Sequence, residues 1–167
     1  MMQQIVEQLM DNIAHTTDLY ERILATERDK QRAIVAADID ALAAIVAREE
    51  VLVSLAGQLE ADRACLRGRF AEADRRLGPG SRLEHVIAVI DGPPHDLLAE
   101  KHQHLLALAA QIHDVNRVNF QLLRSSIDLL RGILDEVLGT SSVPGTYDPS
   151  GHHEAGPRAA TCVDQIL

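Results

Sequence analysis

Apolar residues recur every three or four positions through three long stretches of this sequence, at about residues 2–36, 38–77 and 96–138. This spacing places apolar side chains on one face of an α-helix, because a helix turns once in roughly 3.6 residues. The second stretch is followed by Gly78-Pro79-Gly80 and by Asp91-Gly92-Pro93-Pro94, which are typical of turns. The sequence therefore predicts three long helices.

The composition agrees with a helical fold. Hydrophobic residues make up 46% of the chain, but aromatic residues only 2%, and none is Trp. β-Sandwiches and barrels depend on aromatic and β-branched strands closed by frequent turns, which this chain lacks. We therefore predict an all-α fold, an elongated antiparallel bundle of three long helices plus one short helix in residues 1–139. A flexible, disordered C-terminal tail is expected in residues 140–167, because few bulky apolar residues occur there.

Capping residues mark two predicted helix starts. Asp38 can accept a hydrogen bond from a free backbone N–H, which predicts a break near Ala37. One continuous helix with a bend at this point also fits the pattern. Ser81 and Glu84 have the spacing of a capping box with Ser81 as the N-cap, which predicts a short helix over residues 82–90.

From Leu122 onward the last stretch carries a second apolar stripe beside the first. Two interpretations are open: both stripes fill the core of the bundle, or the wide face is exposed and binds a partner. The partner expected in the second case is an amphipathic helix. The candidate binding residues are Asn116, Asn119, Leu122, Leu123, Ile127, Leu130, Leu134 and Val137.

Asn119 occupies a position of the apolar seam in the last stretch. A buried Asn lowers stability but can fix the register of neighbouring helices. The alternative is an Asn that bonds locally or faces water.

Tyr147 lies in the tail among Gly, Pro, Ser and Thr residues. Tyr offers a large contact area with few rotatable bonds, so Tyr147 is a candidate docking residue. The alternative is a Tyr without a role in binding.

No pattern of catalytic or metal-binding residues is apparent. His102 and His104 diverge on a helix, and no Cys or carboxylate completes a ligand set with His95 and His102. There is no Gly-rich phosphate loop. Cys65 is expected to be a small buried hydrophobic residue. We therefore expect no enzyme activity, no metal and no cofactor.

Charge and hydropathy limit the partners. The formal net charge is −9, and phosphate neutralisation needs clustered Lys and Arg, so nucleic acid is not an expected partner. No apolar run approaches the ~20 residues that cross a bilayer, and no secretory signal is visible. We expect a cytoplasmic protein with no stable membrane insertion.

Four segments, in order along the chain, carry a family resemblance. Residues 27–42 join a charged helix to an acidic D-x-x-x-L start, and residues 59–63 read L-E-x-x-R. Residues 116–123 read N-x-x-N-x-x-L-L, and residues 147–151 read Y-x-x-x-G. On these segments the chain resembles the FlgN family of flagellar type III export chaperones. The residues after Gly151 have no counterpart in that resemblance.

The resemblance implies a small, acidic, helical chaperone of the cytoplasm. Such proteins hold the disordered terminal segments of hook-filament junction (hook-associated) proteins and dock on the cytoplasmic domain of the export gate. The wide apolar face would bind the client's amphipathic helices, and Tyr147 would dock on the gate. The alternative function is a homodimeric coiled-coil adaptor or structural bundle with no role in secretion. An enzyme or metal protein that uses the histidines is a more remote alternative.

Overall fold

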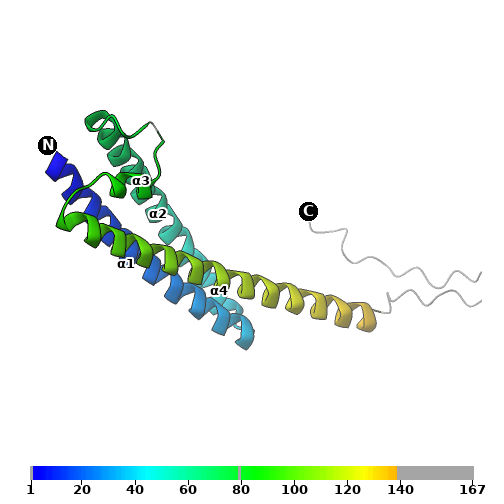
Figure 1. Ribbon diagram of the computed structural model, residues 1–167. Helices are drawn as coiled ribbons and strands as arrows, with labels where there is room; N and C mark the ends of the chain where they lie inside the picture. Colours follow the sequence, from blue (N-terminus) through cyan, green and yellow to red (C-terminus); the bar gives the residue numbers. More distant parts are fainter. Residues whose placement is uncertain (1, 79, 139–167) are drawn as a thin grey trace, which may run out of the picture. The chain divides into compact units, whose positions relative to one another are not determined.

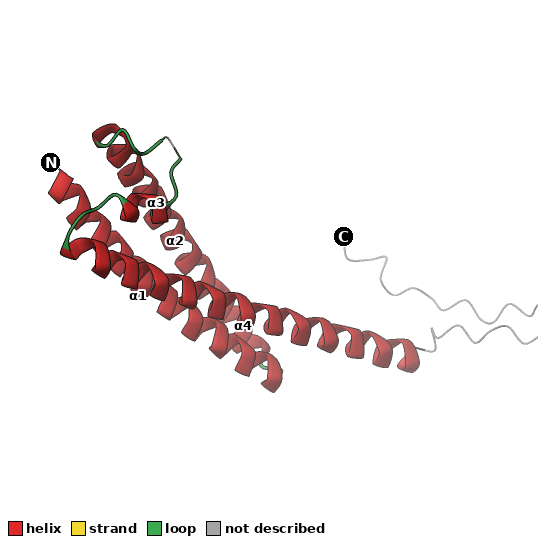
Figure 2. Ribbon diagram, viewed as in Figure 1, coloured by secondary structure: helices red, strands yellow, loops and turns green. Residues whose placement is uncertain are grey.

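The computed structural model describes residues 2–78 and 80–138, and every regular element in these two ranges is an α-helix (Figure 1). The helices are α1 (Met2–Ala36), α2 (Ile39–Ala73), α3 (Leu83–Ala88) and α4 (Pro93–Val137). Figure 2 shows that only loops join them. The prediction of an all-α fold with three long helices and one short helix is confirmed. The predicted tail, 140–167, lies outside the described residues.

A tight turn joins α1 to α2, so the break predicted near Ala37 is confirmed and a continuous helix is wrong. Ala37 has a positive φ of 53°. The Ala37 N–H donates to the Ile34 carbonyl and the Asp38 N–H to the Ala33 carbonyl, which is the bonding of a Schellman C-cap. Asp38 then caps α2, because its Oδ1 accepts from the Ala41 N–H at 2.9 Å.

The start of α3 differs from the prediction. The N-cap residue is Arg82, which makes no side-chain capping bond, and not Ser81. The Ser81 hydroxyl instead donates to the Gly78 carbonyl at 2.9 Å and accepts from the Gly78 N–H at 3.0 Å. The Ser81 hydroxyl is therefore bonded within the loop before α3 and does not cap the helix. The second long helix also ends at Ala73, before the predicted end at Leu77.

One apolar core joins the N-terminal part of α1, the C-terminal part of α2, α3 and the start of α4. Its fully buried members come from all four helices. They include Leu9, Ile13, Phe70, Val86 and Leu98. The short helix α3 contributes Leu83, Val86 and Ile87 to this core. This core positions the start of α4 against α1.

A buried arginine fixes α2 against α1. Arg63 is only 8% exposed. Its guanidinium donates to Asn12 Oδ1 at 3.0 Å, to Thr16 Oγ1 and to Glu60 Oε2. Asn12 in turn donates to the Leu59 carbonyl. The L-E-x-x-R segment therefore supplies a polar layer between two helices, because each buried donor has an acceptor.

The chain divides into two compact units, and the boundary lies inside α4, between Gln121 and Leu122. In the first unit, α4 runs in the same direction as α1: Leu98 joins the core around Leu9, and Asn119 bonds to Glu27. The second unit begins at Leu122, and its described part is the C-terminal segment of α4.

Candidate functional site

The α4 segment from Leu122 to Leu138 exposes both apolar stripes. Leu122 and Leu123 are half-buried, and no side chain from Arg124 to Leu138 is buried. Leu130 is 60% exposed and Leu134 is 55% exposed, and exposure reaches 75% at Val137. Within the described part of the second unit, therefore, neither stripe is packed as a core residue is, because a core residue loses nearly all of its exposure.

The exposed residues form one continuous face. At about 100° per residue, nine apolar side chains fall within about 180° of the helix circumference. We call these nine residues the α4 apolar face: Leu122, Leu123, Ile127, Leu129, Leu130, Ile133, Leu134, Val137 and Leu138. Ser126 is the one polar residue within this arc. A contiguous apolar surface of this kind marks an interaction site in a soluble protein.

The two asparagines before this face have different environments. Asn119 is 1% exposed, and its Nδ2 donates to the backbone oxygen and to Oε2 of Glu27, both at 2.9 Å. Asn119 is therefore a buried residue that bonds to a different helix, and its side chain is not part of an exposed surface. Asn116, three residues earlier, is exposed.

Asn116 lines a groove of about 230 Å³ between α1, α2 and α4. Lys30 and Glu49 form an ion pair in its wall, with Nζ–Oε distances of 2.9 Å, and Lys30 lies 3.5 Å from Glu27. Asn119 extends this network through Glu27. Since the chain of contacts joins three helices, it fixes the position of α4 on the hairpin at the last turns of the first unit.

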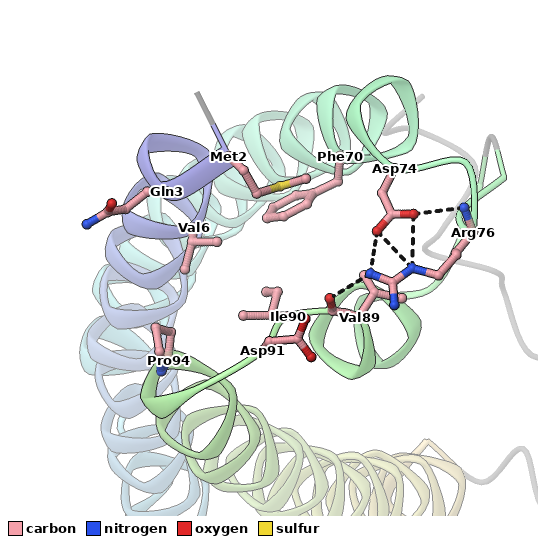
Figure 3. Close-up of a pocket in the computed structure, with 10 residues that line it drawn as sticks. All are labelled: Met2, Gln3, Val6, Phe70, Asp74, Arg76, Val89, Ile90, Asp91 and Pro94. Carbon is pink, nitrogen blue, oxygen red and sulfur yellow. Dashed lines mark hydrogen bonds and ion pairs between the residues drawn. The ribbon is translucent and has the colours of Figure 1, made fainter.

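A larger cavity, of about 450 Å³, lies among the ends of the helices in the first unit. Figure 3 shows Val6, Phe70 and Ile90 around it, with Asp74 and Arg76 on one side. None of the predicted binding residues lines this cavity. It is thus separate from the α4 apolar face.

Beside this cavity, Arg76 ties the loop after α2 to the end of α3. Its guanidinium donates to both carboxylate oxygens of Asp74 and to the Val89 carbonyl, the last at 3.1 Å (Figure 3). These hydrogen bonds hold the pKa of Asp74 below its usual value of 3.8 and raise the pKa of Arg76. The pair is a structural clamp, because its donors and acceptors are used within the fold.

Other predicted features have mixed outcomes. Cys65 is exposed, so its prediction as a buried hydrophobic residue is wrong. Its side chain lines an open groove between α1 and α2, together with Asp11 and His15 of α1. Residues 2–78 and 80–138 contain no group of three or more His, Cys, Asp or Glu side chains that could hold a metal. Tyr147, the predicted docking residue, lies outside the described residues.

A family comparison identifies the chain. The model of the FlgN protein family matches residues 1–155. The chain belongs to the FlgN family. Membership carries the general role of a flagellar export chaperone, as the four sequence segments predicted. Comparisons with curated proteins and with solved structures found no match for this FlgN-family chain.

Among the described helices of this FlgN-family chain, none has the length and apolar character needed to span a membrane.

Proposed function

We propose that the α4 apolar face binds amphipathic terminal helices of hook-filament junction proteins, and that the protein delivers these clients to the type III export gate. The observation that carries the proposal is the exposure of this face in a family of flagellar export chaperones. An amphipathic helix buries its apolar side in such a surface, and its side chains at positions i, i+3, i+4 and i+7 make the contacts. Client helices that would otherwise aggregate are shielded in this way.

Release is part of the function, because a client must leave before secretion. A single exposed helix offers a limited contact area to the client. The client segment also loses conformational entropy when it folds on binding, which lowers the affinity. Both effects keep binding reversible. Tyr147 would act at a later step, as the residue that docks on the cytoplasmic domain of the gate.

The proposed role requires binding and not catalysis, and it takes place in the cytoplasm. No cofactor, metal, nucleic acid or membrane insertion belongs to it. Gate docking and client binding are assigned to different parts of the chain, so each can be removed without the other.

Co-purification tests the proposal. The full chain is co-expressed with tagged terminal segments of hook-filament junction proteins. Wild type should be retained, while Leu130→Asp plus Leu134→Asp should not. Ser125→Asp plus Gly132→Asp adds the same charge on the opposite face and should be retained, since an added Cβ at Gly132 meets no atom within 4 Å. Failure of the wild type to retain any client would reject the proposed function.

One observation supports the alternative function, a homodimeric adaptor. Ile39, Val46 and Val53 are spaced seven residues apart on α2 and are 71%, 47% and 66% exposed. Such a stripe is typical of a helix that pairs with another helix. A dimer mass in light scattering that Val46→Asp plus Val53→Asp reduces to a monomer, together with no client binding, would favour the adaptor.

A further inference from the structure

We infer that the cavity among the helix ends of the first unit is a second binding site, and that it takes an apolar peptide segment of a partner in which a Lys or Arg lies beside the apolar side chain. This site is separate from the α4 apolar face, so the inference goes beyond the proposed function. It follows from the size and lining of the cavity, from the charges at its rim and from one loop with unbonded peptide groups.

The cavity has the size and the apolar floor of a ligand site. Its volume of about 450 Å³ lies within the ~300–1,000 Å³ that is usual for small-ligand pockets. The floor consists of Val6 on α1, Phe70 on α2 and Ile90 in the loop before α4 (Figure 3). All three residues are buried. An apolar group therefore gains by leaving water for this cavity.

Met2 gives the cavity a wall that can change shape. Its side chain lies beside the Phe70 ring (Figure 3), and Met2 is 38% exposed. The unbranched thioether chain of methionine adapts easily, which is why methionine is frequent at surfaces that bind varied apolar partners. An incoming apolar side chain can therefore displace Met2 and reach Phe70 without a change in the backbone.

The charges at the rim favour a cation. α1 and α4 begin beside the cavity, whereas α2 and α3 end there, so the helix dipoles oppose one another and favour neither sign. The charged side chains that line the cavity are Asp74, Asp91 and Arg76. Their sum is one negative charge. A ligand with a Lys or Arg beside its apolar side chain complements this rim.

Asp91 is the carboxylate at the rim that can pair with such a ligand. Arg76 attracts Asp91 electrostatically but makes its bonds to Asp74. With the residues that the structure describes, the Asp91 side chain forms no hydrogen bond or ion pair, and its backbone N–H and carbonyl form no hydrogen bond. These peptide groups can bond to the backbone of a bound segment. They favour a peptide over a small amine, which has no backbone.

Titration of the full chain with capped tripeptides, followed by amide NMR spectra, tests the site. The probes are Leu-Phe-Lys, Leu-Phe-Glu and Gly-Gly-Lys. The first should bind about threefold more tightly than the second, which is the effect expected of one exposed ion pair. The third should not bind measurably, because it has no apolar side chain. The amide signals of Gln3 and Asp91 should shift more than that of Leu130 on the α4 apolar face.

Two matched pairs of variants locate the site. Gln3 lines the cavity, so Gln3→Trp should obstruct it and weaken Leu-Phe-Lys at least about threefold. Gln4 is exposed but does not line the cavity, so Gln4→Trp should have no effect. Asp91→Asn should remove the preference for lysine over glutamate, whereas Asp128→Asn on α4 should keep it. Circular dichroism confirms that the variants remain helical.

Two results would overturn the inference: equal affinity of wild type for the lysine and glutamate peptides, or equal effects of Gln3→Trp and Gln4→Trp. Neither result bears on client binding by the α4 apolar face, which is measured with different variants and different ligands.

Discussion

Asn119 on α4 donates its side-chain amide to both the backbone oxygen and Oε2 of Glu27 on α1, each at 2.9 Å. These residues are 92 positions apart in the sequence. Both side chains are buried. The bond lies two residues before the boundary between the two units. It is therefore the last buried polar anchor of α4 before the α4 apolar face begins.

The first prediction concerns this anchor. Asn119→Ala should lower the free energy of unfolding by about 1–3 kcal/mol, because the variant removes a buried amide that donates to both the carbonyl and the carboxylate of Glu27. Urea denaturation at fixed pH measures the change. Asn116→Ala is the matched control, since Asn116 is exposed, and it should change stability by less than about 0.5 kcal/mol. Equal effects of the two variants would contradict the assigned role of Asn119.

The second prediction concerns the turn between α1 and α2. Ala37 adopts a φ of 53°, a left-handed conformation that costs a non-glycine residue roughly 1 kcal/mol. Ala37→Gly should therefore raise the melting temperature. Ala47→Gly, at an exposed position inside α2, should lower it, because glycine weakens a helix interior by about 0.5–1 kcal/mol. Thermal unfolding followed by circular dichroism compares the two, and a loss of stability in Ala37→Gly would contradict the account of the turn.

The third prediction concerns the polar layer between α1 and α2. Arg63→Ala should cost about 2–3 kcal/mol, because Asn12 Oδ1 and the Thr16 hydroxyl lose their buried donor. Arg67→Ala removes a more exposed partner of Glu60 and should cost less than about 1 kcal/mol. Chemical denaturation of the two variants tests the difference. A small effect of Arg63→Ala would show that the layer does not hold the helices together.

The fourth prediction concerns pH. Since hydrogen bonds from Arg76 lower the pKa of Asp74 in the folded state, its charged form stabilises the fold. This contribution is complete above the usual carboxyl pKa of 3.8 and is lost as pH falls through the lower folded value. Asp74→Asn should therefore be less stable than wild type at about pH 7, with the difference shrinking toward about pH 3.

Denaturation at several pH values measures this dependence, with Asp128→Asn on α4 as the control at an exposed carboxylate. A stability difference between Asp74→Asn and wild type that is the same at every pH would contradict the assignment.

The sequence predicted those features that depend on local pattern. The helical spacing of apolar residues predicted the three long helices. Asp38 predicted the start of α2, because an N-cap side chain bonds to a backbone N–H only two or three residues further on. The Ser81 capping box failed for a local reason too: its hydroxyl bonds to Gly78, and the competing loop bond has no signature in the spacing.

Other features depend on which surfaces meet, and the sequence does not contain that information. Cys65 was expected to be buried, but it is exposed in an open groove between α1 and α2. The burial of Arg63 was not predicted, because two of its three acceptors, Asn12 and Thr16, come from α1 and are far from it in the sequence. The partner of Asn119 could not be named either. The double stripe was visible in the sequence, but the spacing alone left open whether it is buried or exposed.

The affinity of the full chain for the terminal segment of a hook-filament junction protein tests the central claim, that the α4 apolar face binds clients, most directly. Isothermal titration should give an affinity at least about a hundredfold weaker for Leu130→Asp plus Leu134→Asp than for wild type, because each buried leucine contributes about 1.5–3 kcal/mol. The control, Ser125→Asp plus Gly132→Asp, should bind as wild type does. Equal affinity of wild type and the leucine variant would contradict the account.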